Sequence, residues 1–137
     1  TTTRVRLAIV GCGRMGRHHA ALAVADARAS IAAVFDPLAT AAESLCRDFA
    51  PQAKVCRSLD ELWRCNDIDA VILCTPTREH FQQAQTALQR GWHILCEKPL
   101  AATADEIDAL IALAADARQR GRQFSVGYQR RHWATFR

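Results

Sequence analysis

The sequence is poor in aromatic residues and has no long apolar run, and each shortage excludes a class of protein. Aromatic residues make up 7% of the 137 residues, and they are not interleaved with basic residues as on surfaces that stack single-stranded nucleic acids. No apolar stretch reaches the roughly 18 residues of a membrane span, and no charged-then-apolar leader is seen. We therefore expect a cytoplasmic protein that does not interact with membranes.

The six cysteines lack any pairing pattern. None forms a C-x-x-C pair, and no second pair follows at the spacing of a zinc site. Cys74 and Cys96 lie within apolar, strand-like runs, where a reduced thiol acts as a small hydrophobic side chain. The cysteines therefore predict no metal site, and reduced thiols agree with a cytoplasmic location.

Basic residues exceed acidic ones only modestly, giving a net charge of +4. Some arginines gather toward the C-terminus, at Arg118, Arg120, Arg122, Arg130 and Arg131. Such a group can bind nucleic acid, or it can be a solvated helix end with residues facing a phosphate-bearing ligand. We favour the second interpretation, and expect no nucleic-acid partner, because no helix-turn-helix or zinc-finger pattern accompanies the arginines.

Apolar strand patterns alternate with amphipathic helix patterns along the whole chain. This alternation predicts an α/β fold with a doubly wound parallel sheet of about six strands, a Rossmann fold. We expect a domain over residues 1–128 and the start of a connection over 129–137. The predicted strands are 4–10, 30–35, a short one at 55, 70–74, 92–96 and 123–127. The predicted helices cover residues 14–25, 38–49, a short segment from 58, 77–90 and 103 to about 120. Thr77 is predicted to cap the fourth of these helices. Ser58 with Glu61, and Thr103 with Glu106, form capping-box patterns.

A glycine motif, Gly11-x-Gly13-x-x-Gly16, links the first strand to the first helix. In this context it matches the dinucleotide-binding fingerprint, in which the first glycine permits a tight turn and the second lets the backbone approach a pyrophosphate. The third lets the helix pack closely on the strand. Arg14 and Met15 supply first-turn N–H groups, which together with the positive end of the helix dipole favour phosphate.

An acid, Asp36, ends the second strand about 20 residues beyond the motif. Its carboxylate can accept hydrogen bonds from both ribose hydroxyls, and it would repel the 2′-phosphate of NADP. Pro37 stands where NADP-dependent proteins often have a basic residue, so NAD is favoured over NADP. Alternatively, Asp36 is the N-cap of the next helix with Pro37 as its first residue, and both roles are compatible.

Thr75 and Pro76 end the fourth strand, beside the point where such a sheet reverses its strand order. The nicotinamide half of a dinucleotide is expected to run there. His80 falls in the first turn of the following helix. From the sequence, His80 can either reach the ligand or cap and pack the helix, and both alternatives stay open.

The segment Glu97-Lys98-Pro99 follows the fifth strand, at the edge where ligands bind in open α/β sheets. Lys98 is one of only two lysines in a chain with sixteen arginines, which makes it a candidate for chemistry. The alternative is that Lys98 is a solvated loop cation and Pro99 a simple strand terminator.

Several segments together resemble the nucleotide-binding domain of the Gfo/Idh/MocA oxidoreductases, the family of glucose–fructose oxidoreductase and inositol dehydrogenase. These segments are GCGRMG at 11–16, DAVILCTP at 69–76, His80, GWHILCEKPLA at 91–101 and VGYQRR at 126–131. The resemblance covers essentially the whole chain.

The resemblance implies roles that spacing alone does not show. Lys98 would lie beside the nicotinamide and the reacting carbon, orient the substrate hydroxyl and stabilise charge on its oxygen. Glu97 would contact the cofactor, and a cis peptide bond is expected before Pro99. Gln129 stands where many members have Asn, and its amide would reach the nicotinamide side.

The resemblance also implies a protein larger than this chain. Family members continue into a C-terminal α/β domain that supplies most of the substrate pocket, a histidine general base and the oligomer interface, and we expect that domain to be missing here. The expected function is hydride transfer between NAD(P) and a sugar, polyol or related compound, in a homo-oligomer when full length. The alternative is a non-catalytic dinucleotide sensor that regulates a partner.

Overall fold

Six parallel strands form one sheet in the order β3-β2-β1-β4-β5-β6, in a computed structural model that describes residues 3–128. The strands are β1 (Val5–Val10), β2 (Ala29–Phe35), β3 (Lys54–Val55), β4 (Ala70–Leu73), β5 (His93–Cys96) and β6 (Phe124–Val126). The helices are α1 (Arg14–Ala25), α2 (Ala39–Phe49), α3 (Leu59–Trp63), α4 (Thr77–Gln89) and α5 (Ala104–Gln119). The doubly wound α/β prediction is confirmed, and the strand bounds agree within one residue.

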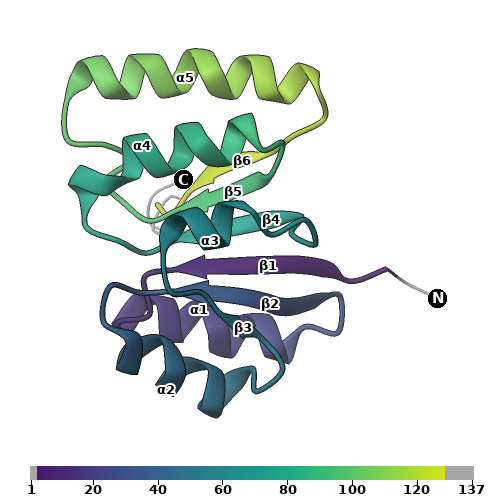
Figure 1. The fold of residues 1–137 in the computed structure, drawn as a ribbon. Helices are drawn as coiled ribbons and strands as arrows, with labels where there is room; N and C mark the ends of the chain where they lie inside the picture. The colour runs from purple at the N-terminus through teal and green to yellow at the C-terminus, as the bar shows by residue number, and fades with distance from the viewer. Residues whose placement is uncertain (1–2, 129–137) are drawn as a thin grey trace, which may run out of the picture.

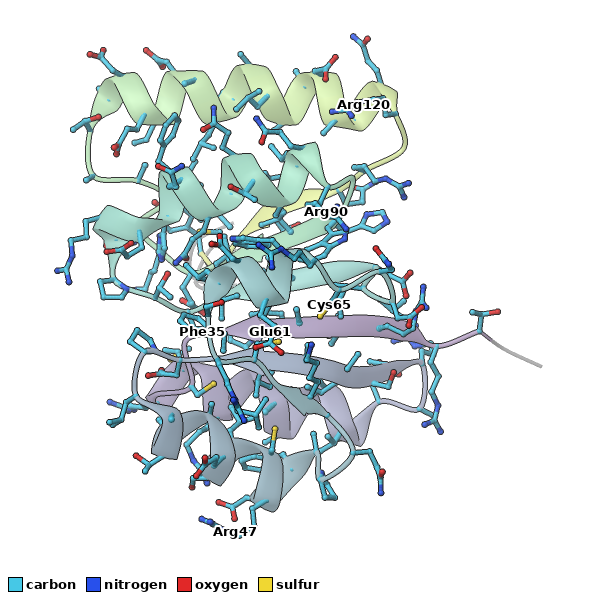
Figure 2. All side chains as sticks on the ribbon, viewed as in Figure 1. Phe35, Arg47, Glu61, Cys65, Arg90 and Arg120 are labelled. Atoms are coloured by element: carbon cyan, nitrogen blue, oxygen red, sulfur yellow. The ribbon has the colours of Figure 1, made fainter. Side chains whose placement is uncertain are left out.

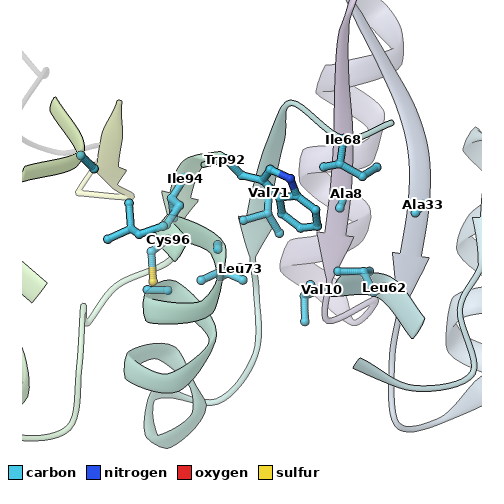
Figure 3. Packing of buried hydrophobic residues seen from close by; sticks show 14 of the residues in the cluster. Ala8, Val10, Ala33, Leu62, Ile68, Val71, Leu73, Trp92, Ile94 and Cys96 are labelled. Carbon is cyan, nitrogen blue, oxygen red and sulfur yellow. The ribbon is translucent and has the colours of Figure 1, made fainter. Parts of the chain in front are cut away.

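Each face of the sheet has its own buried core. In β1, Ile9 packs with residues of α1 and α2, whereas Ala8 and Val10 pack with residues of α3, α4 and α5. A strand buried on both faces needs apolar residues at successive positions, which explains the unbroken apolar runs in the sequence. Figure 1 shows α1 and α2 beside β1 to β3, and α4 and α5 beside β4 to β6. Val71, Leu73 and Ile94 pack side by side in the second core (Figure 3).

Capping side chains begin two of the helices. The hydroxyl oxygen of Thr103 accepts from the N–H of Glu106 at 3.2 Å, and the Glu106 carboxylate accepts from the N–H of Thr103 at 3.3 Å, so this capping box is confirmed. Ser58 likewise accepts from the N–H of Glu61 at 3.1 Å. The Glu61 carboxylate accepts from Arg57 at 2.8 Å instead of Ser58, so only half of the second box is formed.

The start of α4 corrects one prediction. Thr77 is the first residue of the helix and not its cap, because Pro76 occupies the N-cap position, where it makes no side-chain hydrogen bond. The φ of Pro76 is −57°, within the range that its ring allows, and the helix follows directly. The far ends of α4 and α5 are as predicted, with Gly91 and Gly121 at φ 74° and 76°.

Surface arginines are spread over separate elements, where acidic side chains neutralise several of them. Arg17 of α1 lies 2.6 Å from a carboxylate oxygen of Asp48, and Arg120, after α5, lies 3.0 Å from one of Asp116. Arg47 and Arg120 lie on opposite outer layers of the molecule (Figure 2). Among the helices of residues 3–128, none is long and apolar enough to cross a membrane.

The parallel register brings the carboxyl ends of the strands to one edge. Val10 is paired with Leu73, Leu73 with Cys96, and Cys96 with Val126. The segments that follow these residues therefore lie side by side, although they are up to 116 residues apart in the sequence (126 − 10). The strand order reverses between β1 and β4, which is where open α/β sheets bind their ligands.

Candidate functional site

The glycine turn after β1 is tightly packed at two positions and open at the third. Gly11 has φ 92°, and a Cβ there would lie 2.6 Å from the carbonyl oxygen of Cys74. A Cβ on Gly16 would overlap the carbonyl oxygen of Gly11, so α1 can approach the turn only with glycine at this position. A Cβ on Gly13 would meet nothing within 4 Å. The open space therefore lies in front of Gly13.

The N-terminus of α1 begins at this open space. Gly13 is the N-cap, so no side chain caps the helix, and the first turn has no acidic residue. Arg14 and Met15 follow on the exposed side. The N–H groups of an uncapped first turn, with the positive end of the helix dipole, suit a pyrophosphate.

Asp36 connects the end of β2 to the glycine turn. One of its carboxylate oxygens accepts from the N–H of Cys12 at 2.8 Å, and the other accepts from the N–H of Leu38 at 2.8 Å. The N-cap of α2 is Leu38, so the prediction of Asp36 as N-cap with Pro37 as first helical residue is wrong by two positions. The bond from Asp36 to the residue two further on forms an Asx turn, which delays the helix to Ala39.

A groove of about 470 Å³ runs between the glycine turn and α4. It is lined by Gly11, Gly13, Phe35, Asp36, Thr75 and Pro76, among others; Phe35 at the end of β2 is labelled in Figure 2. A second hollow of about 370 Å³ lies on the other side of α1, at Met15, Glu97 and Tyr128. Two larger hollows, of about 620 and 540 Å³, lie at the amino ends of the strands, and none of the predicted site residues within 3–128 lines them.

His80 connects two loops of the edge from inside the protein. Its side chain is buried, with 1% of its surface exposed. Nε2 lies 2.8 Å from the carbonyl oxygen of Thr75, and Nδ1 lies 2.9 Å from that of Pro99. Both ring nitrogens are thus engaged by backbone, which supports the packing alternative. Contact of His80 with the cofactor stays a prediction. The hydroxyl of Thr75 also points inward and donates to Gln83 at 2.6 Å.

Glu97 is held by a residue that the sequence did not reveal. Nε2 of His19, on α1, lies 2.6 Å from Oε1 of Glu97, and the two side chains are 15% and 14% exposed. Oε2 of Glu97 lies 3.1 Å from the position of a Cβ on Gly127. One signal pointed to His19: it lies one helical turn after Met15, and so shares the face of α1 that continues from the glycine turn.

Lys98 is exposed at this edge, and its peptide bond to Pro99 is cis, as the resemblance led us to expect. Within the described part of the chain, Lys98 forms no ion pair, whereas Lys54 lies 2.8 Å from a carboxylate oxygen of Glu61. The ammonium group of Lys98 is therefore available to a ligand. Gln129, the remaining predicted site residue, lies outside the described residues.

Three cysteines surround the edge without offering a nucleophile. Cys12, Cys74 and Cys96 are free thiols, and burial is the main cause that raises the pKa of each to about 12. The negative charges of Asp36 and Glu97 act in the same direction. Such thiols stay protonated at neutral pH. Cys96 packs in the core as a small hydrophobic side chain, as predicted, whereas Cys74 is half-buried and lines the groove.

Comparison with known families identifies this arrangement. The family model GFO_IDH_MocA, described as an oxidoreductase family with an NAD-binding Rossmann fold, matches residues 5–128. The chain belongs to the Gfo/Idh/MocA oxidoreductase family. The open glycine turn and the groove beside Asp36 fit the dinucleotide that this NAD-binding domain takes.

Relatives of this Gfo/Idh/MocA domain include dehydrogenases of inositol and of a nucleotide sugar. An inositol 2-dehydrogenase of Rhizobium meliloti is 32% identical over 127 residues, which are 93% of this chain and 37% of the relative. A UDP-N-acetylglucosamine 3-dehydrogenase of Acidithiobacillus ferrooxidans is 39% identical over 115 residues, or 80% of this chain and 33% of the relative.

A solved structure extends the likeness to the fold of a ligand-bound enzyme. The myo-inositol dehydrogenase from Lactobacillus casei, in complex with NAD(H) and myo-inositol, has a TM-score of 0.88 and 30% identity, covering 96% of this chain and 39% of that one. The Gfo/Idh/MocA domain described here thus spans less than half the length of the relatives it matches.

Proposed function

We propose that this domain binds NAD across the carboxyl edge of its sheet and serves a dehydrogenase that acts on a sugar or polyol hydroxyl. The observation that carries the proposal is the shape of the edge. The glycine turn after β1 is open at Gly13. The turn that carries Lys98 follows β5 at the same carboxyl edge of the sheet, with β4 between the two strands. A dinucleotide is long enough to contact both places.

The chain's own groups divide the contacts with the cofactor. The N–H groups from Gly13 to Gly16, including those of Arg14 and Met15, would hold the pyrophosphate. Asp36 would accept from the ribose hydroxyls, since each carboxylate oxygen has a second lone pair beyond its bond to Cys12 or Leu38. The same carboxylate would repel a 2′-phosphate, which favours NAD over NADP.

Contacts near the nicotinamide end would come from later segments. Thr75 and Pro76 line the groove at the end of β4. Glu97 and Gln129 would flank the ring side, although Glu97 already bonds to His19. We assign residues 1–128 to the cofactor domain and 129–137 to the start of a connection to a substrate and oligomerisation domain.

Lys98 is the catalytic residue of the proposal. When bound, the dinucleotide supplies the group that accepts or returns a hydride. The exposed ammonium of Lys98 would donate a hydrogen bond to the reacting oxygen of the substrate and stabilise negative charge on that oxygen. The general base that takes the hydroxyl proton would come from the rest of the protein. Six free thiols support a cytoplasmic location.

The relatives point to the substrate class, because inositol and UDP-N-acetylglucosamine both carry ring hydroxyls. A chimera of residues 1–137 and the remainder of the Rhizobium meliloti inositol 2-dehydrogenase tests the assignment. We expect NAD reduction with myo-inositol, and a fall of about 10²- to 10³-fold in kcat for Lys98→Met. Lys54→Met is the matched control, since Lys54 lies in a surface ion pair.

Two outcomes would count against the proposal. A chimera that binds NADH and turns over equally well with Lys98→Met would remove Lys98 from catalysis. A folded chimera that binds NADH without oxidising any sugar or polyol would favour the sensor alternative instead.

A further inference from the structure

The residues on either side of Lys98 are each held by a histidine from a different helix. His19 of α1 contacts Glu97, and His80 of α4 contacts the carbonyl of Pro99. The helices α1 and α4 pack in the two different cores of the sheet. We propose that His19 and His80 are positioning residues that fix the backbone beside Lys98, so that its ammonium group meets the substrate. The proposal rests on the function assigned to Lys98 above.

The first hold acts on Glu97. Its carboxylate receives the 2.6 Å contact from His19, on the side away from α4, and lies against the backbone of Gly127. Its own N–H donates to the carbonyl oxygen of Leu73 at 2.9 Å, while the preceding carbonyl, of Cys96, accepts from Gly127 at 2.8 Å. Glu97 is thereby connected to α1, β4 and the end of β6.

The second hold acts on Pro99. Its carbonyl oxygen lies 2.9 Å from Nδ1 of His80, and the other ring nitrogen lies 2.8 Å from the carbonyl oxygen of Thr75. Each nitrogen faces an acceptor, so any N–H that the ring carries is satisfied inside the protein. A neutral ring donates to one of these oxygens and an imidazolium to both. Since His80 is almost fully buried, the contact is shielded from water, and the ring lies between the turn after β5 and the loop after β4.

Lys98 is thus an exposed side chain between two anchored neighbours. Its reach depends on where the backbone of this turn lies, because its exposed side chain makes no hydrogen bond or ion pair with the described residues that would fix it. An error of about 1 Å in placing a catalytic group can cost about 10²-fold in rate. One buried and one partly buried polar contact on a single three-residue turn are more than packing requires, since apolar side chains could fill the same space.

The two lysines of the chain make this turn easy to observe. Reductive methylation with ¹³C-formaldehyde labels Lys54, Lys98 and the terminal amine, and ¹⁵N relaxation reports backbone motion at residue 98. In the wild-type chain we expect a rigid amide at Lys98, and a Lys98 methyl signal that shifts when NADH is added. The methyl signal of Lys54, which forms an ion pair with Glu61, should not shift when NADH is added.

The variants separate positioning from folding. His19→Leu and His80→Leu should lower the order parameter of the Lys98 amide from about 0.85 towards 0.6, and should at least halve the NADH-induced shift at saturation. His19→Gln retains a donor and should restore both. Gly127→Ala presses on the Glu97 carboxylate and should act like His19→Leu, even if His80→Leu fails to fold. The exposed neighbour His18, changed to Gln, is the matched control.

The two proposals fail in different ways. Wild-type relaxation and shift in folded His19→Leu and Gly127→Ala would overturn the positioning role while leaving NAD binding intact. If the order parameter of the Lys98 amide falls in the variants while the wild-type chain binds no NADH, the positioning role of the two histidines is supported and the cofactor function is overturned.

Discussion

The carboxylate of Asp36 accepts a hydrogen bond from the backbone N–H of Cys12 at 2.8 Å. This contact joins the end of β2 to the glycine turn after β1, and it places a negative charge beside the groove before any ligand arrives. The second carboxylate oxygen is held by Leu38, so the side chain has little freedom to turn away. The acid that we assign to ribose recognition is therefore oriented by its own backbone neighbours.

Replacing Asp36 tests that assignment. Asp36→Ala should weaken NADH binding by about 10- to 100-fold, the equivalent of roughly 1.5–3 kcal/mol for hydrogen bonds to a charged group. The preference for NADH over NADPH should shrink at the same time, because the repulsion of a 2′-phosphate is lost. Calorimetric titration measures both affinities. Asp26→Ala, at the other end of the strands, should leave them unchanged.

Two glycines of the turn should respond in opposite ways. Gly13→Ala should unfold in urea like the wild type, since its Cβ would meet nothing within 4 Å, yet its methyl group would stand where the pyrophosphate is expected and reduce NADH affinity. Gly16→Ala should lose about 1–3 kcal/mol or more of unfolding free energy, because its Cβ overlaps Gly11. Undiminished NADH affinity in Gly13→Ala would contradict the assigned phosphate site.

Acid should break the contact between Arg6 and Asp69, at the amino ends of the strands, and remove the stability that it contributes. Hydrogen bonds from Arg6 hold the pKa of Asp69 below its usual range, with the closest donor–acceptor distances 2.8 Å. A lowered folded-state pKa means stability that is present above the unfolded value and lost as pH falls through the folded one. Asp69→Asn should be less stable than the wild type at pH 7, and the difference should begin to shrink near pH 4, about the unfolded value, and vanish below the lowered folded pKa. Urea unfolding across this range measures the difference.

The three thiols at the carboxyl edge should resist alkylation. With pKa values of about 12, Cys12, Cys74 and Cys96 should react with iodoacetamide at pH 8 far more slowly in the native chain than in urea. Peptide mass spectrometry resolves the three sites. Rapid native modification of Cys12 would mean that the glycine turn opens much more readily than its packing indicates.

The sequence was sufficient for the fold because local patterns and the fold agree. Apolar runs buried on both faces, the glycine motif between strand and helix, and the Thr103 box each predicted what the structure contains. The dinucleotide edge followed, since parallel strands bring their carboxyl ends together.

Contacts between side chains of distant segments could not be predicted from the sequence. The bond of His19 to Glu97 joins residues 78 positions apart and depends on how α1 lies against β5. His80 was ambiguous for the same reason, because its partners are backbone oxygens of two separate loops. At Asp36 the error was one of competing local chemistry, since an Asx turn with Leu38 moved the start of α2.

Titration of the wild-type chain with NADH and NADPH is the most direct test of the cofactor site. We expect one binding site for NADH, with NADPH weaker by about tenfold or more because of the Asp36 charge. A chain shown to be folded by circular dichroism that takes up neither dinucleotide at millimolar concentration would contradict it.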